Sequence, residues 1–443
     1  MPDDARPSPL PRHHLTDARG IGGRIKVRPE DFVVEEIPAY EPCGEGEHLY
    51  LGIQKTGVSH GELLRVLERH FDVSHKQIGY AGMKDKHAVT RQMISIHLPD
   101  DPREVQPNHE RIAVLWAARH RNKLRRGHLR GNRFSIRIRD VEPVHAPTAL
   151  RVLRELEGRG MPAWYGEQRF GYRLNNHLLG AMLLRREHEA ACRELCGSEG
   201  SWFPEYQRER RELFDAGRYA EAAERWTPAD RSELIVCRAL ARGATWGDAI
   251  RGIGPVTLKF WTSALASAAF NRVFDERLEA GTAERLLEGD LAWKHDSRAI
   301  FAVTPAELSD PDVLRHRYDA FEVSPSGPLW GAGMPEAFGD VDRAERAALA
   351  AFGADPQLMA TGPWRPEGSR RPFRDVLEHP DVEGGFDDHG PYVRCVFDLR
   401  RGMYATMVLR EIMRSDDVVA GVRGGGDRDT ADAAVASDDL DTG

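Results

Sequence analysis

The sequence predicts an α/β (α+β) protein built in two parts, and two patterns lead to this prediction. Segments with the two-residue alternation of β-strands lie between about residues 25 and 139 and again at 391–399. The stretch from about residue 174 to 280 has instead the apolar spacing of α-helices. The 443 residues suffice for two domains, or for one domain with a large insertion.

Composition and charge narrow the class of protein. With 41% hydrophobic and 30% charged residues, the chain has the composition of a soluble globular protein. No apolar run reaches the roughly eighteen residues needed to span a membrane. The five cysteines are odd in number and scattered, which argues against a disulfide framework and favours a reducing cytoplasm. Residues 1–20 lack the apolar core of a secretory signal, and we expect them, like the acidic tail at 421–443, to be disordered.

The expected elements follow from apolar periodicity and turn residues taken along the chain. Strands are predicted at 32–34, 49–53, 78–81, 88–96, 131–139 and 391–399. Helices are predicted at 61–70, 148–156, 263–278 and 403–412. Ser326-Gly327-Pro328-Leu329-Trp330-Gly331 has the composition of a turn, with Trp330 buried.

One short loop carries the strongest candidate for chemistry. In the stretch GYAGMKDKHAVTRQ, residues 79–92, Gly82 ends the first strand and Lys84, Asp85 and Lys86 follow. Nearby cations favour the ionised carboxylate and lower its pKa, by roughly one to three units for a close partner. Asp85 is therefore a candidate nucleophile or base. On local composition alone, the alternative is an ordinary solvated turn.

A strip of positive charge suggests a nucleic-acid partner. The net charge is −8, yet residues 119–139 contain nine Lys or Arg residues and no acid. In the strand 131–139, alternation places Phe134 on the face opposite Arg133, Arg137 and Arg139. A merely solvated strand face is the alternative interpretation of the basic side.

Several of these segments, in one order, resemble the TruD family of tRNA pseudouridine synthases. The loop matches the family motif G-x-K-D-x-x-A-x-T-x-Q, in which the aspartate is catalytic. Further phrases match K-x-x-P-E-D-F-x-V-E-E at 26–36, G-E-G-E-H at 44–48, K-T-G at 55–57, R-G-N-x-F at 130–134, S-G-P-L-W-G at 326–331 and Y-A-T-x-V-x-R-E at 404–411. The family phrase N-Y-F-G-x-Q-R-F-G is matched at 163–171, with departures at Ala163, Trp164 and Tyr165.

The resemblance implies a fold and its boundaries. It implies a pseudouridine synthase core with a mixed β-sheet, interrupted by a mostly helical TRUD insertion domain. The catalytic domain would comprise residues 21–160 and 376–420, and the insertion would comprise residues 161–375.

The resemblance also implies an activity, the isomerisation of uridine to pseudouridine in tRNA, at position 13 in the family. Asp85 would act covalently after the base is flipped out of the RNA. Phe134 could stack on that base and the Asn132 amide could bond its edge. The residues expected to bind substrate are Lys26, Lys84, Asn132, Phe134, Gln168, Arg169 and Phe170.

No cofactor or metal is expected, since the sequence has no P-loop, Rossmann glycine pattern or HExxH motif. We expect a cytoplasmic protein, a monomer, with no membrane partner. Two other classes remain as alternatives: a non-catalytic tRNA-binding or folding module, and a different RNA enzyme such as a nuclease or methyltransferase. For Arg169 and Phe170, the alternative to substrate binding is a structural role, in which Arg169 pairs with an acid and Phe170 lies in the core.

Overall fold

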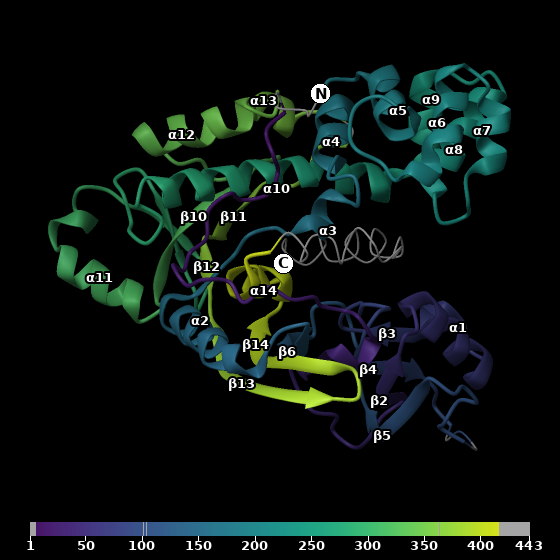
Figure 1. The fold of residues 1–443 in the computed structure, drawn as a ribbon, viewed down its shortest axis with the longest axis horizontal. Coiled ribbons are helices and arrows are strands. Elements are labelled where there is room, and N and C mark those ends of the chain that lie inside the picture. Colours follow the sequence, from purple (N-terminus) through teal and green to yellow (C-terminus); the bar gives the residue numbers. More distant parts are fainter. Residues whose placement is uncertain (1–5, 101, 103, 363, 416–443) are drawn as a thin grey trace. The chain divides into compact units, whose positions relative to one another are not determined.

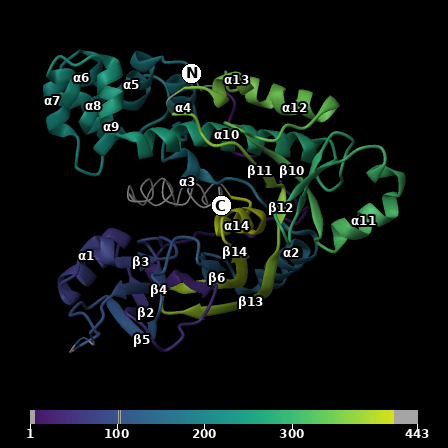
Figure 2. The ribbon, with the colours of Figure 1, turned by 180° about the vertical axis from the view of Figure 1, so that it is seen from behind.

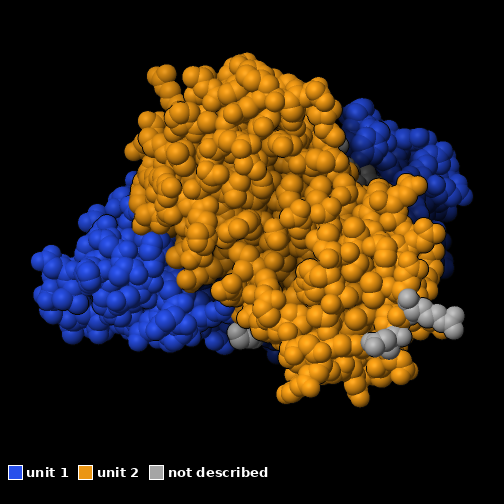
Figure 3. All heavy atoms as spheres, turned by 90° about the horizontal axis from the view of Figure 1, so that it is seen from below, with its two compact units in different colours: residues 1–15, 163–374, 442 blue, residues 16–162, 375–441, 443 orange. Residues whose placement is uncertain are grey.

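The computed structural model describes residues 6–100, 102, 104–362 and 364–415. These residues divide into two compact units, coloured separately in Figure 3. The sheet unit comprises residues 16–162 and the segment that begins at residue 375, and the insertion unit comprises residues up to 15 together with 163–374. The division lies two residues after the first expected boundary and one residue before the second.

The sheet unit is organised around one eight-stranded mixed sheet. The strand order is β13-β14-β6-β1-β4-β2-β5, and β3 pairs with β4 beyond the end of β1 (Figure 1). β1 and β4 are parallel and every other pair is antiparallel, so the expected mixed sheet is confirmed. The strands are β1 (Phe32–Pro38), β2 (His48–Thr56), β3 (Ile78–Tyr80), β4 (Val89–His97), β5 (Ile112–His120), β6 (Leu129–Arg139), β13 (Leu377–Asp387) and β14 (Gly390–Arg400).

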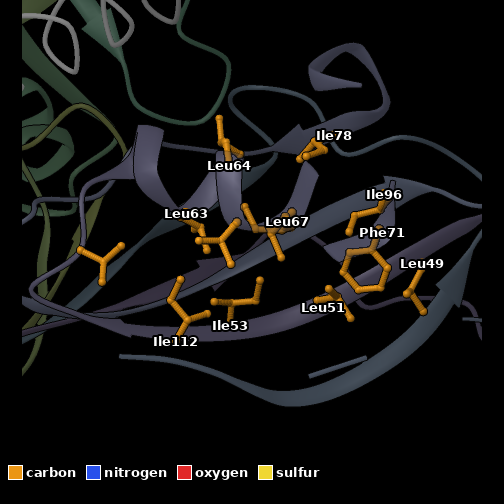
Figure 4. Close-up of a cluster of buried hydrophobic side chains, with 13 residues drawn as sticks. Leu49, Leu51, Ile53, Leu63, Leu64, Leu67, Phe71, Ile78, Ile96 and Ile112 are labelled. Carbon is orange, nitrogen blue, oxygen red and sulfur yellow. The ribbon is translucent and has the colours of Figure 1, made fainter. Parts of the chain in front are cut away.

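Helix α1 (His60–Phe71) covers part of one face of this sheet. Its leucines at 63, 64 and 67 are spaced by three and four residues, so they share one side of the helix. Figure 4 shows this side packed against Leu51, Ile53 and Ile96 from β2 and β4. Ser59 caps the helix by accepting a hydrogen bond from the amide of Glu62. The other helices of the unit are α2 (Ala146–Arg159) and α14 (Ala405–Met413), with single turns η1 (Pro29–Asp31), η2 (His75–Gln77) and η3 (Pro143–His145).

The insertion unit is mostly helical, as expected, and is organised around the long helix α10 (Pro255–Glu279). α10 contacts α4, α12 and β10 (Figure 2). The unit also holds a four-stranded sheet of order β11-β10-β8-β9. Its helices are α3 (Glu167–Phe170), α4 (Asn176–Leu184), α5 (His188–Cys196), α6 (Arg208–Asp215), α7 (Tyr219–Arg225), α8 (Arg231–Ala241), α9 (Trp246–Ile253), α11 (Pro311–Asp319), α12 (Gly339–Ala350) and α13 (Pro356–Ala360), with turns η4 (Glu205–Gln207) and η5 (Glu307–Ser309).

The remaining strands are β8 (Leu291–Lys294), β9 (Ile300–Ala302), β10 (Val323–Leu329) and β11 (Ser369–Pro372), and the two-residue strands β7 (Met161–Pro162) and β12 (Arg374–Asp375) lie where the chain passes between units. None of the helices in the described part of the chain is long and apolar enough to cross a membrane.

The predicted turn at 326–331 is wrong, because most of it belongs to β10. The first half of this strand pairs with β8 and the second half with β11, so along each half a regular ladder runs on one edge only. Proline lacks the amide that a ladder needs, and an edge without a ladder tolerates it. Pro325 and Pro328 therefore fit within the strand. Trp330 just after it is buried, as predicted.

The expected disorder of residues 1–20 does not hold from residue 6 onward. Arg12 donates from Nε to Oδ2 of Asp275 at 2.9 Å within the insertion unit. Thr16 donates from its amide and its hydroxyl to Oε2 of Glu411, each at 3.0 Å, within the sheet unit. Both acids are buried, and buried polar groups need hydrogen-bond partners. These bonds therefore hold the N-terminal segment in place. Residues 1–5 and the predicted disordered tail at 421–443 lie outside the described residues.

Candidate active site

Asp85 lies on the loop of residues 81–88 that joins β3 to the antiparallel β4. The predicted loop between two strands is thus confirmed. In a solvated turn the charged side chains would be exposed to water. Here the Lys84 side chain is only 6% exposed and the Asp85 side chain is 29% exposed. The carboxylate is held by the protein and still reaches solvent, which a nucleophile that acts on a macromolecule requires.

Lys26 is the closest cation to the Asp85 carboxylate, although the two are far apart in sequence. Its Nζ donates to Oδ2 of Asp85 at 2.8 Å, and the lysine side chain is 16% exposed. The same ammonium lies 4.6 Å from the centre of the Phe32 ring. Lys26 has a φ of 55°, in the left-handed region, which costs a non-glycine residue about 1–2 kcal/mol. Strain of this kind is typical of residues whose position serves a site.

These cations lower the pKa of Asp85. The largest cause is the charge of Lys26, opposed by burial, and the hydrogen bond from Lys26 and the charges of Lys55 and Lys84 add to the lowering. The sequence neighbours Lys84 and Lys86 were the expected cause, whereas the main contribution comes from Lys26. Asp85 is therefore a carboxylate at neutral pH.

Lys84 turns away from Asp85 and joins two polar residues of the sheet. Its Nζ donates to Oδ1 of Asn132 at 2.8 Å and lies 3.0 Å from Oε2 of Glu36, whose side chain is 1% exposed. Glu36 and Asn132 are directly opposed in the pairing of β1 with β6, so their side chains share one face. The network fixes one end of the loop on the sheet, and the charge of Lys84 still contributes to lowering the pKa of Asp85. The predicted contacts of Lys84 and Asn132 with substrate stay a prediction.

Phe134 is buried rather than presented at the surface. It is 8% exposed, and its ring centre lies 6.3 Å from that of Phe32 and 5.7 Å from that of Phe397. The predicted alternation of β6 is confirmed, because Ile136 and Ile138 are also buried. Through Phe32, the ring belongs to the aromatic cluster beneath Lys26. Stacking of Phe134 on a base remains a prediction.

Gln168, Arg169 and Phe170 lie in α3 of the insertion unit. Phe170 is fully buried, as the core interpretation expected. Arg169 is 3% exposed, donates from Nε to the hydroxyl of Ser267 at 3.0 Å and lies over the ring of Phe260. Gln168 is the half-buried member of the three. Their roles in binding substrate remain predictions.

The basic strip separates into two halves. Two arginines of β6 are paired with acids: Arg133 donates from Nε to Asp398 at 2.7 Å, and Arg139 donates from Nε to Asp31 at 2.9 Å and from Nη1 to Asp387 at 2.6 Å. Arg139 is only 2% exposed, so its predicted place on a basic outer face is wrong. The acids that neutralise these residues come from η1, β13 and β14, remote in sequence.

The other half of the strip remains exposed. Arg125, Arg126 and Arg130 are exposed in or beside the loop between β5 and β6. Arg126 donates to the Tyr80 hydroxyl at 3.0 Å, and Tyr80 is the last residue of β3 before the loop of Asp85. Arg126 thus lies beside the strand that leads into the loop of Asp85. The three exposed arginines are the part of the strip suited to contact phosphate.

Two residues that the sequence did not single out complete the site. Glu36 partners Lys84, and Lys55 donates from Nζ to the carbonyl oxygens of Val58 and Asp85, each at 2.7 Å. Both are charged residues at positions where strand alternation predicts a buried apolar side chain, after Phe32 and Val34 in β1 and after Leu51 and Ile53 in β2. A charge on the apolar face of a strand is the signal that could have found them.

No metal centre is formed by the residues described. Within the described ranges, no group of three or more His, Cys, Asp or Glu side chains is placed to share a metal ion. The charged groups closest to Asp85 are ammonium groups, which would repel a cation. The chemistry available to this site is therefore that of a carboxylate surrounded by lysines.

Comparisons with known proteins agree on one family. Residues 11–412 match the family model described as tRNA pseudouridine synthase D (TruD). The chain is 40% identical over 405 residues to the tRNA pseudouridine synthase D of Geobacter sulfurreducens, which covers 91% of this chain and 97% of the relative. For the enzyme of the same name from Geotalea daltonii the identity is 39%, over 89% and 98% of the two chains.

A solved structure leads to the same assignment. A crystal structure from Methanosarcina mazei, of a protein named tRNA pseudouridine synthase D (TruD), has a TM-score of 0.77 and 26% identity. The match covers 93% of this chain and 98% of the other. Family model, relatives and structure each extend across both units. The chain therefore belongs to the tRNA pseudouridine synthase D (TruD) family.

Proposed function

We propose that this protein isomerises uridine at position 13 of tRNA, with Asp85 as the residue that acts covalently on the substrate nucleotide. As a member of the TruD family, the chain is a tRNA pseudouridine synthase, an isomerase that converts uridine to pseudouridine in tRNA. The observation that carries the proposed role of Asp85 is its placement: a partly exposed carboxylate, kept ionised by Lys26 at 2.8 Å.

The carboxylate has one oxygen available for chemistry. Lys26 bonds Oδ2, and no hydrogen bond from the described residues reaches Oδ1. Oδ1 would attack either the ribose or the pyrimidine ring, and the glycosidic bond between N1 and C1′ would break. The uracil then turns, C5 bonds to C1′, and loss of the proton from C5 with release of Asp85 gives pseudouridine. Atoms and charge balance, because C5 loses one proton and N1 gains one.

Lys26 would serve both the carboxylate and the substrate. While paired it keeps Asp85 ionised, and during attack its ammonium stabilises charge that moves between the carboxylate and the nucleotide. Lys84 and Asn132 would bind the flipped nucleotide from the sheet side, and the exposed arginines 125, 126 and 130 would contact phosphates. Phe134, Gln168, Arg169 and Phe170 complete the proposed substrate-binding set. We further propose that the protein acts in the cytoplasm as a monomer.

A transcript experiment tests the activity and its position. A tRNA transcript with uridine at position 13 is incubated with the protein, beside a transcript that differs only by cytidine at that position. We expect pseudouridine at position 13 of the first and none in the second. Pseudouridine elsewhere would contradict the position, and binding without pseudouridine in either transcript would favour the non-catalytic binding module.

A further inference from the structure

Lys55 occupies a position where the sheet otherwise buries apolar side chains. In β2, Leu49, Leu51 and Ile53 point to the face that α1 covers, and they are 0–5% exposed. Alternation puts Lys55 on the same face, and it is 0% exposed. A buried ammonium is costly unless hydrogen bonds replace its water. A lysine at this position therefore needs partners that use its charge and its three donors.

Those partners are main-chain carbonyls, and two of them flank Asp85. The Nζ of Lys55 donates to the carbonyl oxygen of Asp85 at 2.7 Å and to that of Lys84 at 3.3 Å. It also donates to Val58 at 2.7 Å, in the segment that leads into α1. The peptide groups before and after the Asp85 α-carbon are thus both tied to one strand. Fixing both peptide groups fixes the direction in which the Asp85 side chain leaves the backbone.

We propose that Lys55 is a positioning residue that clamps the catalytic loop through its backbone and so aims the Asp85 carboxylate at the substrate nucleotide. The proposal rests on the proposed role of Asp85. In this proposal Lys55 acts through the backbone of the loop rather than by contacting the substrate. It differs from Lys84, which ties the loop to the sheet through side chains and whose partners are Glu36 and Asn132.

A lysine suits this task for a physical reason. The carbonyl oxygens of residues 58, 84 and 85 converge on one point, and an ammonium offers three donors from a single atom. An apolar side chain would leave these oxygens without their donor and free the loop to move. Because a displacement of about 1 Å at a reacting group can cost roughly 100-fold in rate, a loosened loop should impair chemistry before it impairs binding.

The test compares Lys55→Met with a matched control, Lys294→Met, which removes a half-buried strand lysine of the insertion unit. For Lys55→Met we expect a single-turnover rate about 100-fold lower, with tRNA affinity within about threefold of wild type. We also expect faster hydrogen exchange in peptides that cover residues 81–88. The control should match wild type in all three measurements.

A pH profile separates positioning from general support of the fold. Because the charge of Lys55 helps to lower the pKa of Asp85, its removal should move the acid limb of the rate to higher pH. Lys55→Gln, which keeps donors without charge, should show the same pH shift with a smaller change in exchange. Wild-type rate and wild-type loop exchange in either folded variant would overturn the proposal. Failure of both variants to fold would also overturn it, since Lys55 would then be a folding residue.

Hydrogen exchange keeps this proposal distinct from the proposed function. If the wild-type protein forms no pseudouridine, the assignment of Asp85 fails while the loop measurement still reports whether Lys55 clamps the backbone. If the wild type is active and loop exchange is unchanged in Lys55→Met, only the positioning role fails.

Discussion

The loop at 81–88 and the basic strip at 119–139 both contain many charged residues in a short length of the same unit. In each, the contacts in the folded protein differ from what the local composition predicts. The loop has the composition of a solvated turn, yet Lys84 is buried and Asp85 is bonded to Lys26. The strip has the composition of a binding surface, yet Arg133 and Arg139 are bonded to acids from other strands. Local sequence thus predicts where charged residues lie, whereas partners remote in sequence determine which of them remain available to contact a substrate.

The β6 half of the strip should therefore matter for stability rather than for RNA. Arg139→Met leaves the buried Asp31 without its partner, and breaking a buried pair costs about 3–5 kcal/mol. Urea unfolding should show this loss. Arg137→Met is the matched control, because its side chain is 33% exposed and its Nη1 lies 4.0 Å from Asp387, and it should cost no more than about 1 kcal/mol. Equal losses would remove the distinction between paired and solvated arginines.

Lys26→Met tests the electrostatics of the loop. Lys26 lowers the pKa of Asp85, so its removal raises that pKa and fewer molecules carry the carboxylate at a given acidic pH. The acid limb of the single-turnover rate should therefore move to higher pH. Lys86→Met, which removes the sequence neighbour, should shift it less. A larger shift for Lys86 would reverse the assignment of the main cation.

The exposed half of the strip should affect affinity and its dependence on salt. Replacing Arg125, Arg126 and Arg130 by Ala should weaken binding to all tRNAs and flatten the slope of log affinity against log salt by roughly 0.7–0.9 for each lost phosphate contact. Arg133→Ala serves as the control from the paired half, because its guanidinium is bonded to Asp398, and it should leave the slope unchanged. Titrations at several salt concentrations decide between them, and the reverse pattern would place RNA on the β6 side.

Alternation and turn residues predicted much of the fold. They placed the strands on both sides of the catalytic loop and the buried face of β6, because these depend on neighbours in sequence. They failed at β10, where Pro325 and Pro328 are tolerated because the strand changes partner midway. That exchange depends on two strands remote in sequence, which periodicity cannot reveal.

The same limit applies to the site. Asp85, Lys84 and Asn132 could be identified from the sequence through the resemblance, but not the contacts that hold them. The pair of Lys26 with Asp85 spans 59 residues, and the contact between Lys84 and Asn132 spans 48. The roles of Lys55 and Glu36 could not be predicted, because a single charged residue in an apolar strand pattern does not indicate which remote residue it contacts.

The central claim is that the Asp85 carboxylate carries out the covalent step. Asp85→Asn keeps the size of the side chain and removes its negative charge and most of its nucleophilicity. A single-turnover assay on tRNA, with affinity measured in parallel, should show that pseudouridine formation is abolished while tRNA binding is largely retained. A variant that keeps a substantial fraction of the wild-type rate would contradict the account, because another group would then have to be the nucleophile.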